Sequence, residues 1–126
     1  MKTKILVSIF VVTFCLSGCA TTPYSKTDKA LFGSVVALQV VDGLTTADML
    51  SDGSVMSGDW AWKYGTDTPS ASRMWGIKAL ELGGAYVAGR YLPPAWRRGF
   101  FLIVDSILLY CIQTNLQVGA GFTVNY

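Results

Sequence analysis

The stretch that decides the fold runs from Leu92 to Leu116 and reads "LPPAWRRGFFLIVDSILLYCIQTNL". Pro93 and Pro94 must end any helix that reaches them, because neither donates a backbone N–H and each clashes with a continuing turn. The residues from Gly99 to Leu116 carry one charged side chain and approach the length of a membrane-spanning helix. We therefore predict a helix over 99–116 that forms an antiparallel hairpin with the helix before it.

The helix before the prolines is predicted from about Ala71 to Leu92, and it brings charges to the hairpin. Asp105 lies eleven residues after Pro94, and Glu81 lies eleven before Leu92. At ~1.5 Å per residue both lie about 16 Å from the turn, with Lys78 one turn deeper. We predict an internal polar cluster of Lys78, Glu81 and Asp105, with a Lys78–Asp105 bridge. It is either an ion pair that fixes helix register or a site that handles protons or ions.

A first helix is predicted from about Lys29 to Leu50, with Thr27 and Asp28 as its capping residues. Its unusual feature is a polar stripe, since Gln39, Asp42 and Thr46 share one face. This stripe is a candidate surface for contact with a partner.

Aromatic residues alternate within the long loop that follows, over 51–72. In "DWAWKYG", Trp60, Trp62 and Tyr64 recur with a period of two, which predicts either a short strand or rings lying at a membrane surface. The final "VGAGFTVNY", 118–126, shows the same alternation and can pair with the Trp60–Tyr64 segment. The predicted fold is mainly α, a small three-helix arrangement with this short β pairing. Trp60, Trp62 and Tyr64 are further candidates for partner contact.

The N-terminus has the pattern of an exported chain. Lys2 and Lys4 precede the apolar run Ile5 to Cys15, which is too short for a transmembrane helix and is typical of a signal peptide. The run ends in Leu16-Ser17-Gly18-Cys19, which resembles the bacterial lipobox. The resemblance implies cleavage before Cys19 and acylation of Cys19 with chains such as palmitate. It divides the chain into a signal (1–18), a lipidated tether (19–28) and one small helical domain (29–126).

Composition excludes several classes of function. Removal of Lys2 and Lys4 from the ten Lys and Arg leaves eight basic against eight acidic residues, so no basic excess indicates nucleic acid as a partner. The chain has no histidine, and one cysteine would remain after processing and acylation. Ser-His-Asp, Cys-His and His-based zinc sites are therefore ruled out. We predict a non-enzymatic protein whose only attached group is the lipid on Cys19.

The mature part also resembles a group of small uncharacterised lipoproteins of proteobacteria and their phages. The resemblance is carried by the lipobox, Asp42-x-x-Thr45-Thr46, "LPPAWRR" at 92–98, and Asn115 before "VGAGF". It implies an address in the cell envelope and no particular activity. Ala20, directly after the lipobox cysteine, resembles the pattern sorted to the outer membrane.

Three functions remain open. The first is a lipid-anchored envelope protein without catalytic activity that acts by contact with another envelope component or by self-association. It would lie on the periplasmic face of the outer membrane, with the inner membrane as the alternative. The second is a phage-type lipoprotein that either disrupts a membrane during lysis or links two membranes, similar to a spanin. The third is a membrane hairpin that handles protons or ions through Lys78, Glu81 and Asp105.

Overall fold

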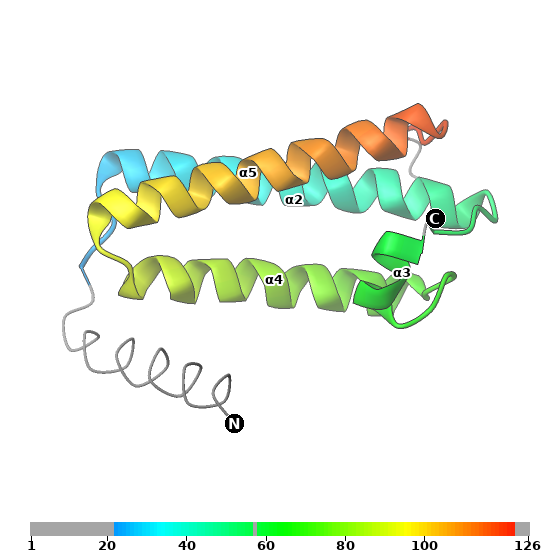
Figure 1. Ribbon diagram of the computed structural model, residues 1–126, viewed down its shortest axis with the longest axis horizontal. Coiled ribbons are helices and arrows are strands. Elements are labelled where there is room, and N and C mark those ends of the chain that lie inside the picture. Colours follow the sequence, from blue (N-terminus) through cyan, green and yellow to red (C-terminus); the bar gives the residue numbers. More distant parts are fainter. Residues whose placement is uncertain (1–21, 57, 123–126) are drawn as a thin grey trace, which may run out of the picture.

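The computed structural model describes residues 22–56 and 58–122. Within them the chain forms four helices, which confirms the prediction of a mainly α protein. They are α2 (Lys26–Ser51), α3 (Gly58–Tyr64), α4 (Ala71–Tyr91) and α5 (Pro94–Gln117) (Figure 1). The predicted signal, the lipobox and Cys19 lie outside the described residues.

Each long helix begins at a recognisable sequence signal. Ser25 caps α2, since its side chain accepts a hydrogen bond from the Asp28 backbone while the Asp28 carboxylate accepts from the Ser25 backbone. Ser70 caps α4 in a similar way. Helix α5 begins at Pro94 itself, a position where the missing N–H costs nothing. Helix α2 starts three residues and α5 five residues earlier than the sequence indicated.

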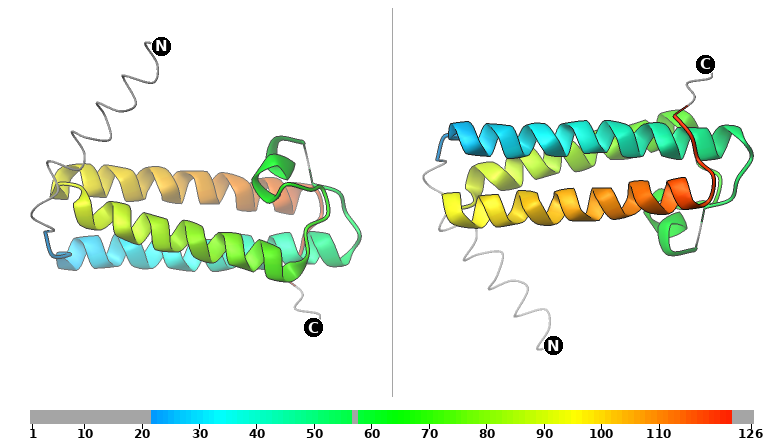
Figure 2. Two further views of the ribbon diagram at one scale, coloured as in Figure 1. Left: turned by 90° about the horizontal axis from the view of Figure 1, so that it is seen from below. Right: turned by 90° about the horizontal axis from the view of Figure 1, so that it is seen from above.

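The three long helices lie side by side (Figures 1 and 2). Helix α5 packs most extensively along α2, which also packs against α4, while the packing between α4 and α5 is smaller. Leu92 and Pro93 connect α4 directly to α5. A self-contained hairpin of these two helices is therefore not the packing unit, because each of them packs more extensively against α2 than against the other.

The predicted strand over Trp60–Tyr64 is wrong, because these residues belong to the short helix α3. In a helix, positions three and four apart share a face, so Tyr64 is buried while Trp62 is exposed. No strand occurs in residues 22–56 or 58–122. Ala120 donates its backbone N–H to Asn115, and Gly121 donates to the Asp48 carboxylate. The chain after α5 is thus tied to α5 and α2 rather than to a strand.

The described interior is unusual in its chemistry. Its apolar centre is small: Val35, Phe101 and Leu108 pack with half-buried neighbours. Nearly as many polar and charged side chains are buried as apolar ones: Asp28, Gln39, Asp42, Thr45, Thr46, Asp48, Lys78 and Arg97. Because buried charges are costly without partners, the way these groups are paired determines what the bundle can do.

Candidate functional site

A buried ion pair joins the middle of the bundle. Lys78 on α4 donates its Nζ to the Asp42 Oδ2 on α2, and the two side chains are only 2% and 4% exposed. Helix geometry brings them together, since both residues lie on the inner faces of helices that pack along each other. Removal from water makes such a pair dependent on further hydrogen bonds.

Those further hydrogen bonds come from α5. The Asn115 Nδ2 donates to the Thr45 Oγ1 at 2.9 Å and to the Thr46 Oγ1 at 3.2 Å, and lies 3.4 Å from the Asp42 Oδ1. Both threonine hydroxyls in turn donate to the Asp42 backbone carbonyl. Asn115 therefore links α5 to the ion pair between α2 and α4.

A second, shallower pair adjoins the first. Lys63 on α3 lies 2.8 Å from the Glu81 Oε1 on α4, and the Gln39 Nε2 donates to the Glu81 Oε2 at 2.8 Å. Gln39 also lies 3.4 Å from the Lys78 backbone carbonyl. We call the connected set the polar network. Its members are Gln39, Asp42, Thr45, Thr46, Lys63, Lys78, Glu81 and Asn115.

Lys63 is held in its charged form. Burial by itself would lower the pKa of Lys63, but the hydrogen bond to Glu81 and the charges of Tyr64, Glu81 and Asp42 outweigh it and raise that pKa above its usual value. The ammonium also lies 5.7 Å from the Trp60 ring centroid and 5.3 Å from that of Tyr64. Helix α3 thus covers the Glu81 carboxylate with a cation flanked by two aromatic rings.

Several predicted site residues occur in this network, but in roles other than those expected. Gln39, Asp42 and Thr46 are buried, so the polar stripe of α2 does not form part of the outer surface of the bundle. It faces α4 and α5 because those helices supply its hydrogen-bonding partners. Tyr64 is also buried, and Trp62 is the aromatic of α3 that stays exposed.

The predicted Lys78–Asp105 bridge is wrong. Asp105 accepts a hydrogen bond from Ser34 at 2.5 Å instead, because α5 packs mainly on α2 and turns this side chain toward it. The number of residues from the proline turn fixes the position of a side chain along its helix axis, but not which neighbouring helix the side chain faces. Lys63, Thr45 and Asn115 were not among the predicted site residues. One feature of the sequence did point to Asn115, since a polar amide side chain is unusual in such an apolar helix.

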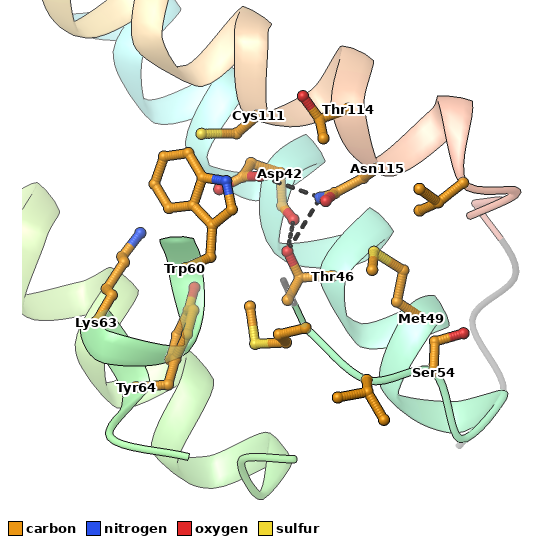
Figure 3. A pocket seen from close by; sticks show the side chains of 13 residues that line it. Asp42, Thr46, Met49, Ser54, Trp60, Lys63, Tyr64, Cys111, Thr114 and Asn115 are labelled. Atoms are coloured by element: carbon orange, nitrogen blue, oxygen red, sulfur yellow. Dashed lines mark hydrogen bonds between the residues drawn. The ribbon is translucent and has the colours of Figure 1, made fainter. Parts of the chain in front are cut away.

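A cavity of about 410 Å³ lies beside the network. Helices α2, α3 and α5 and the loop after α2 contribute to its walls. Figure 3 shows Asp42, Thr46 and Asn115 joined by hydrogen bonds at one wall, with Trp60 and Tyr64 on the α3 side. Met49, Val55, Met56 and Val118 supply apolar surface, and Cys111 is a further lining residue.

A second buried cation lies at the opposite end of the bundle, where α2 and α5 begin. Arg97 is fully buried and donates to Asp28 at 2.9 Å, to the Gly89 carbonyl at 2.6 Å, and to the carbonyls of Thr22 and Pro23. Its guanidinium carbon lies 4.8 Å from the Tyr24 ring centroid. Arg97 therefore fastens the segment before α2 onto the turn between α4 and α5.

The ionisable groups at the centre of the network are engaged with one another. Asp42 and Lys78 are engaged with each other, and Cys111 has no histidine beside it because the chain contains none. Across residues 22–56 and 58–122, no three His, Cys, Asp or Glu side chains come together as a metal site would require. No protein-family model, curated protein or solved structure matches this chain.

Proposed function

We propose that this chain is a non-catalytic protein of the bacterial envelope that acts by contact, anchored by lipid on Cys19 and embedded in a bilayer by its three long helices. The observation that carries the proposal is the inverted distribution of polarity. Among the described residues, five charged side chains are buried inside the bundle, and many large apolar side chains are exposed on α4 and α5. Most of the exposed charges lie toward the ends of the helices or in the loops.

The lateral surface supports a lipid environment. The large apolar side chains left exposed along α4 and α5 include Leu80, Val87, Leu102, Ile103, Ile107 and Leu109. Between Lys29 and Asp48, α2 carries one charge, the buried Asp42. A soluble monomer rarely leaves so large an apolar surface in water, whereas the same surface facing lipid costs nothing.

Helix dimensions support the same arrangement. Helices α2 and α5 are long and apolar enough to cross a membrane. Helix α4 has 21 residues, or about 32 Å at ~1.5 Å per residue, close to the ~30 Å hydrocarbon core. The two charges in the middle of α4, Lys78 and Glu81, are paired with Asp42 and Lys63, and its arginines, Arg73 and Arg90, lie toward its two ends. Exposed Trp96 belongs to the first turn of α5 and exposed Trp62 to α3, and these two elements lie at opposite ends of the bundle (Figure 1), as interfacial aromatics do.

The arginines of the α4–α5 turn count against a membrane-spanning arrangement, but their ion pairs with Asp28 make this objection weaker. With Cys19 outside the cytoplasm, a spanning bundle puts this turn outside as well, against the usual preference of arginine for the cytoplasmic side. Arg97, however, is fully buried and paired with Asp28, and the Arg98 Nε lies 3.5 Å from the other Asp28 oxygen. These cations serve the fold, which weakens them as a topology signal.

Contact would then involve membrane-exposed surfaces rather than the predicted polar stripe. Trp62 is 77% exposed on α3, and the apolar faces of α4 and α5 adjoin the bilayer. A second copy of the chain or another envelope protein would meet these faces.

The test is membrane retention without the lipid. Residues 1–18 are replaced by a cleavable signal of the ordinary secretory type, and Cys19→Ala removes the acylation site without leaving the signal attached. We expect this protein to remain in the inner-membrane fraction after alkaline carbonate extraction. Its release as a soluble periplasmic protein would contradict the proposal and favour a lipid-anchored bundle outside the bilayer. Recovery of the native chain with the outer membrane would favour the same conclusion.

The two alternative functions receive less support. A spanin-like link needs the lipidated end and the last helix in different membranes, whereas α2 and α5 pack lengthwise against each other. Proton or ion handling is supported by the buried Asp42–Lys78 pair, but Val35, Phe101 and Leu108 form an apolar layer between the two polar ends.

A further inference from the structure

We propose that the cavity between α2, α3 and α5 binds a neutral, hydroxyl-bearing amphiphile of the acylglycerol class. This inference goes beyond the proposed function, since a protein that acts by contact needs no ligand. Three properties of the cavity carry it: its size and apolar lining, the charge balance of its walls, and a hydrogen-bond acceptor left without a donor.

Size and lining indicate a small, largely apolar ligand. A volume of about 410 Å³ falls in the range of small-molecule sites, which are usually apolar with a few convergent polar groups. Met49, Met56 and Trp60 offer adaptable and aromatic surface. Three of the polar lining residues, Asp42, Thr46 and Asn115, meet at one wall.

The charge balance indicates a neutral ligand. Asp42 is paired with Lys78, and Lys63 is paired with Glu81, so the charges near the cavity cancel. An anionic head group would have to take Lys63 or Lys78 from its carboxylate, and a cationic one would have to take Asp42 or Glu81 from its lysine. Either would have to break a pair that is partly or fully removed from water, which is costly.

The hydrogen-bonding state of Asn115 indicates a hydroxyl donor. Its Nδ2 serves Thr45, Thr46 and Asp42, whereas its carbonyl Oδ1 accepts no hydrogen bond from any described residue. The Ser54 hydroxyl, also at the cavity wall, is likewise without a described partner. An amide oxygen and a hydroxyl together match a glycerol head group, whose hydroxyls both donate and accept.

The test uses three amphiphiles with the same twelve-carbon chain and different heads: 1-monolauroylglycerol, dodecanoate and dodecyltrimethylammonium. Cys111 lines the cavity and is 8% exposed, so its alkylation by N-ethylmaleimide reports occupancy. The purified full chain is held in nanodiscs, and mass spectrometry follows the peptide that contains Cys111. We expect monolauroylglycerol to slow alkylation about tenfold at saturation, and the two charged amphiphiles to slow it less than about twofold.

Variants test the source of the selectivity. Asn115→Leu keeps the number and branching of the side-chain heavy atoms and leaves the Thr45 and Thr46 hydroxyls bonded to the Asp42 carbonyl. We expect it to weaken protection by monolauroylglycerol about tenfold. Gln113→Leu, on the exposed side of the same helix, is the matched control and should change nothing. Ser54→Ala probes the same head group without touching the network, and it should weaken protection about threefold.

Equal protection by all three amphiphiles, or protection by none, would overturn the proposal. So would selectivity that survives both Asn115→Leu and Ser54→Ala. None of these outcomes depends on where the protein lies in the envelope, so the ligand site and the proposed function fail separately.

Discussion

At the scale of single residues, the energetics centre on charges that the fold has removed from water. Lys78 and Asp42 are almost fully buried, and they meet with Asn115, Thr45 and Thr46. In such a pair the attraction roughly offsets the cost of desolvation, so the pair contributes less to stability than to a unique arrangement. Leaving one partner alone is a different matter, since the remaining charge then has no compensation.

This asymmetry gives a residue-scale prediction. Lys78→Met strands the Asp42 carboxylate and should cost about 3–5 kcal/mol of unfolding free energy. The double variant Lys78→Met with Asp42→Leu removes both charges and should recover most of that loss. Unfolding in mixed detergent micelles, titrated with sodium dodecyl sulfate, measures both.

Lys63→Met is the control for that series. It breaks the Lys63–Glu81 pair, whose carboxylate side chain is 39% exposed, and should cost about 0–1 kcal/mol. An equal loss in Lys63→Met and Lys78→Met would show that burial of the Asp42–Lys78 pair is not what makes it sensitive.

At the scale of the helices, a close approach between α4 and α5 depends on glycine. A Cβ on Gly89 of α4 would lie 2.6 Å from the Phe101 Cζ and also collide with the Tyr24 hydroxyl. Phe101 is fully buried in α5 and has little room to move. Gly84 belongs to the same helix, and a Cβ there would meet nothing within 4 Å.

These two glycines give a matched pair of variants. Gly89→Ala should destabilise the bundle by about 1–3 kcal/mol through overpacking. Gly84→Ala should be neutral or stabilise it by up to about 1 kcal/mol, because alanine favours the helix. The same detergent titration distinguishes them. A loss of similar size in Gly84→Ala would mean that the outer face of α4 is itself packed, as it would be against a second copy.

The same helices show what sequence reasoning can and cannot provide. The prolines at 93 and 94 and the apolar run after them predicted the break and the last helix, because both signals are local. The side of a helix that faces a given neighbour is set by tertiary packing, which local sequence signals do not report. Asp105 therefore accepts a hydrogen bond from Ser34 on α2 instead of pairing with Lys78. For the same reason the stripe of Gln39, Asp42 and Thr46 is buried rather than exposed.

The strand prediction for Trp60–Tyr64 was wrong for a different reason. Five residues with alternating aromatics fit a strand pattern, but a helix of seven residues, Gly58–Tyr64, fits them as well. In α3 the alternation places Trp62 outward, while Tyr64 is buried and the Lys63 ammonium reaches Glu81. Tertiary contacts to α4 decide between the two.

At the scale of the whole molecule, buried charges and exposed apolar side chains favour a lipid environment over water. The interior holds two buried cations, Lys78 and Arg97, each with a carboxylate partner. The outside of α4 and α5 holds leucine, isoleucine and valine. Helix association in a bilayer relies on close packing and on polar contacts between helices, because apolar burial provides no driving force there. Both features occur in this bundle.

The most direct test of this account is the environment of the outward-facing side chains. Spin labels are placed one at a time at Leu80→Cys, Ile107→Cys and Asp52→Cys, in a Cys111→Ser, Cys19→Ala background made with a cleavable signal and reconstituted in nanodiscs. We expect the labels at positions 80 and 107 to collide with oxygen and to be shielded from a water-soluble nickel chelate, and the loop label at 52 to show the reverse. Nickel accessibility at 80 and 107 equal to that at 52 would contradict the embedded bundle.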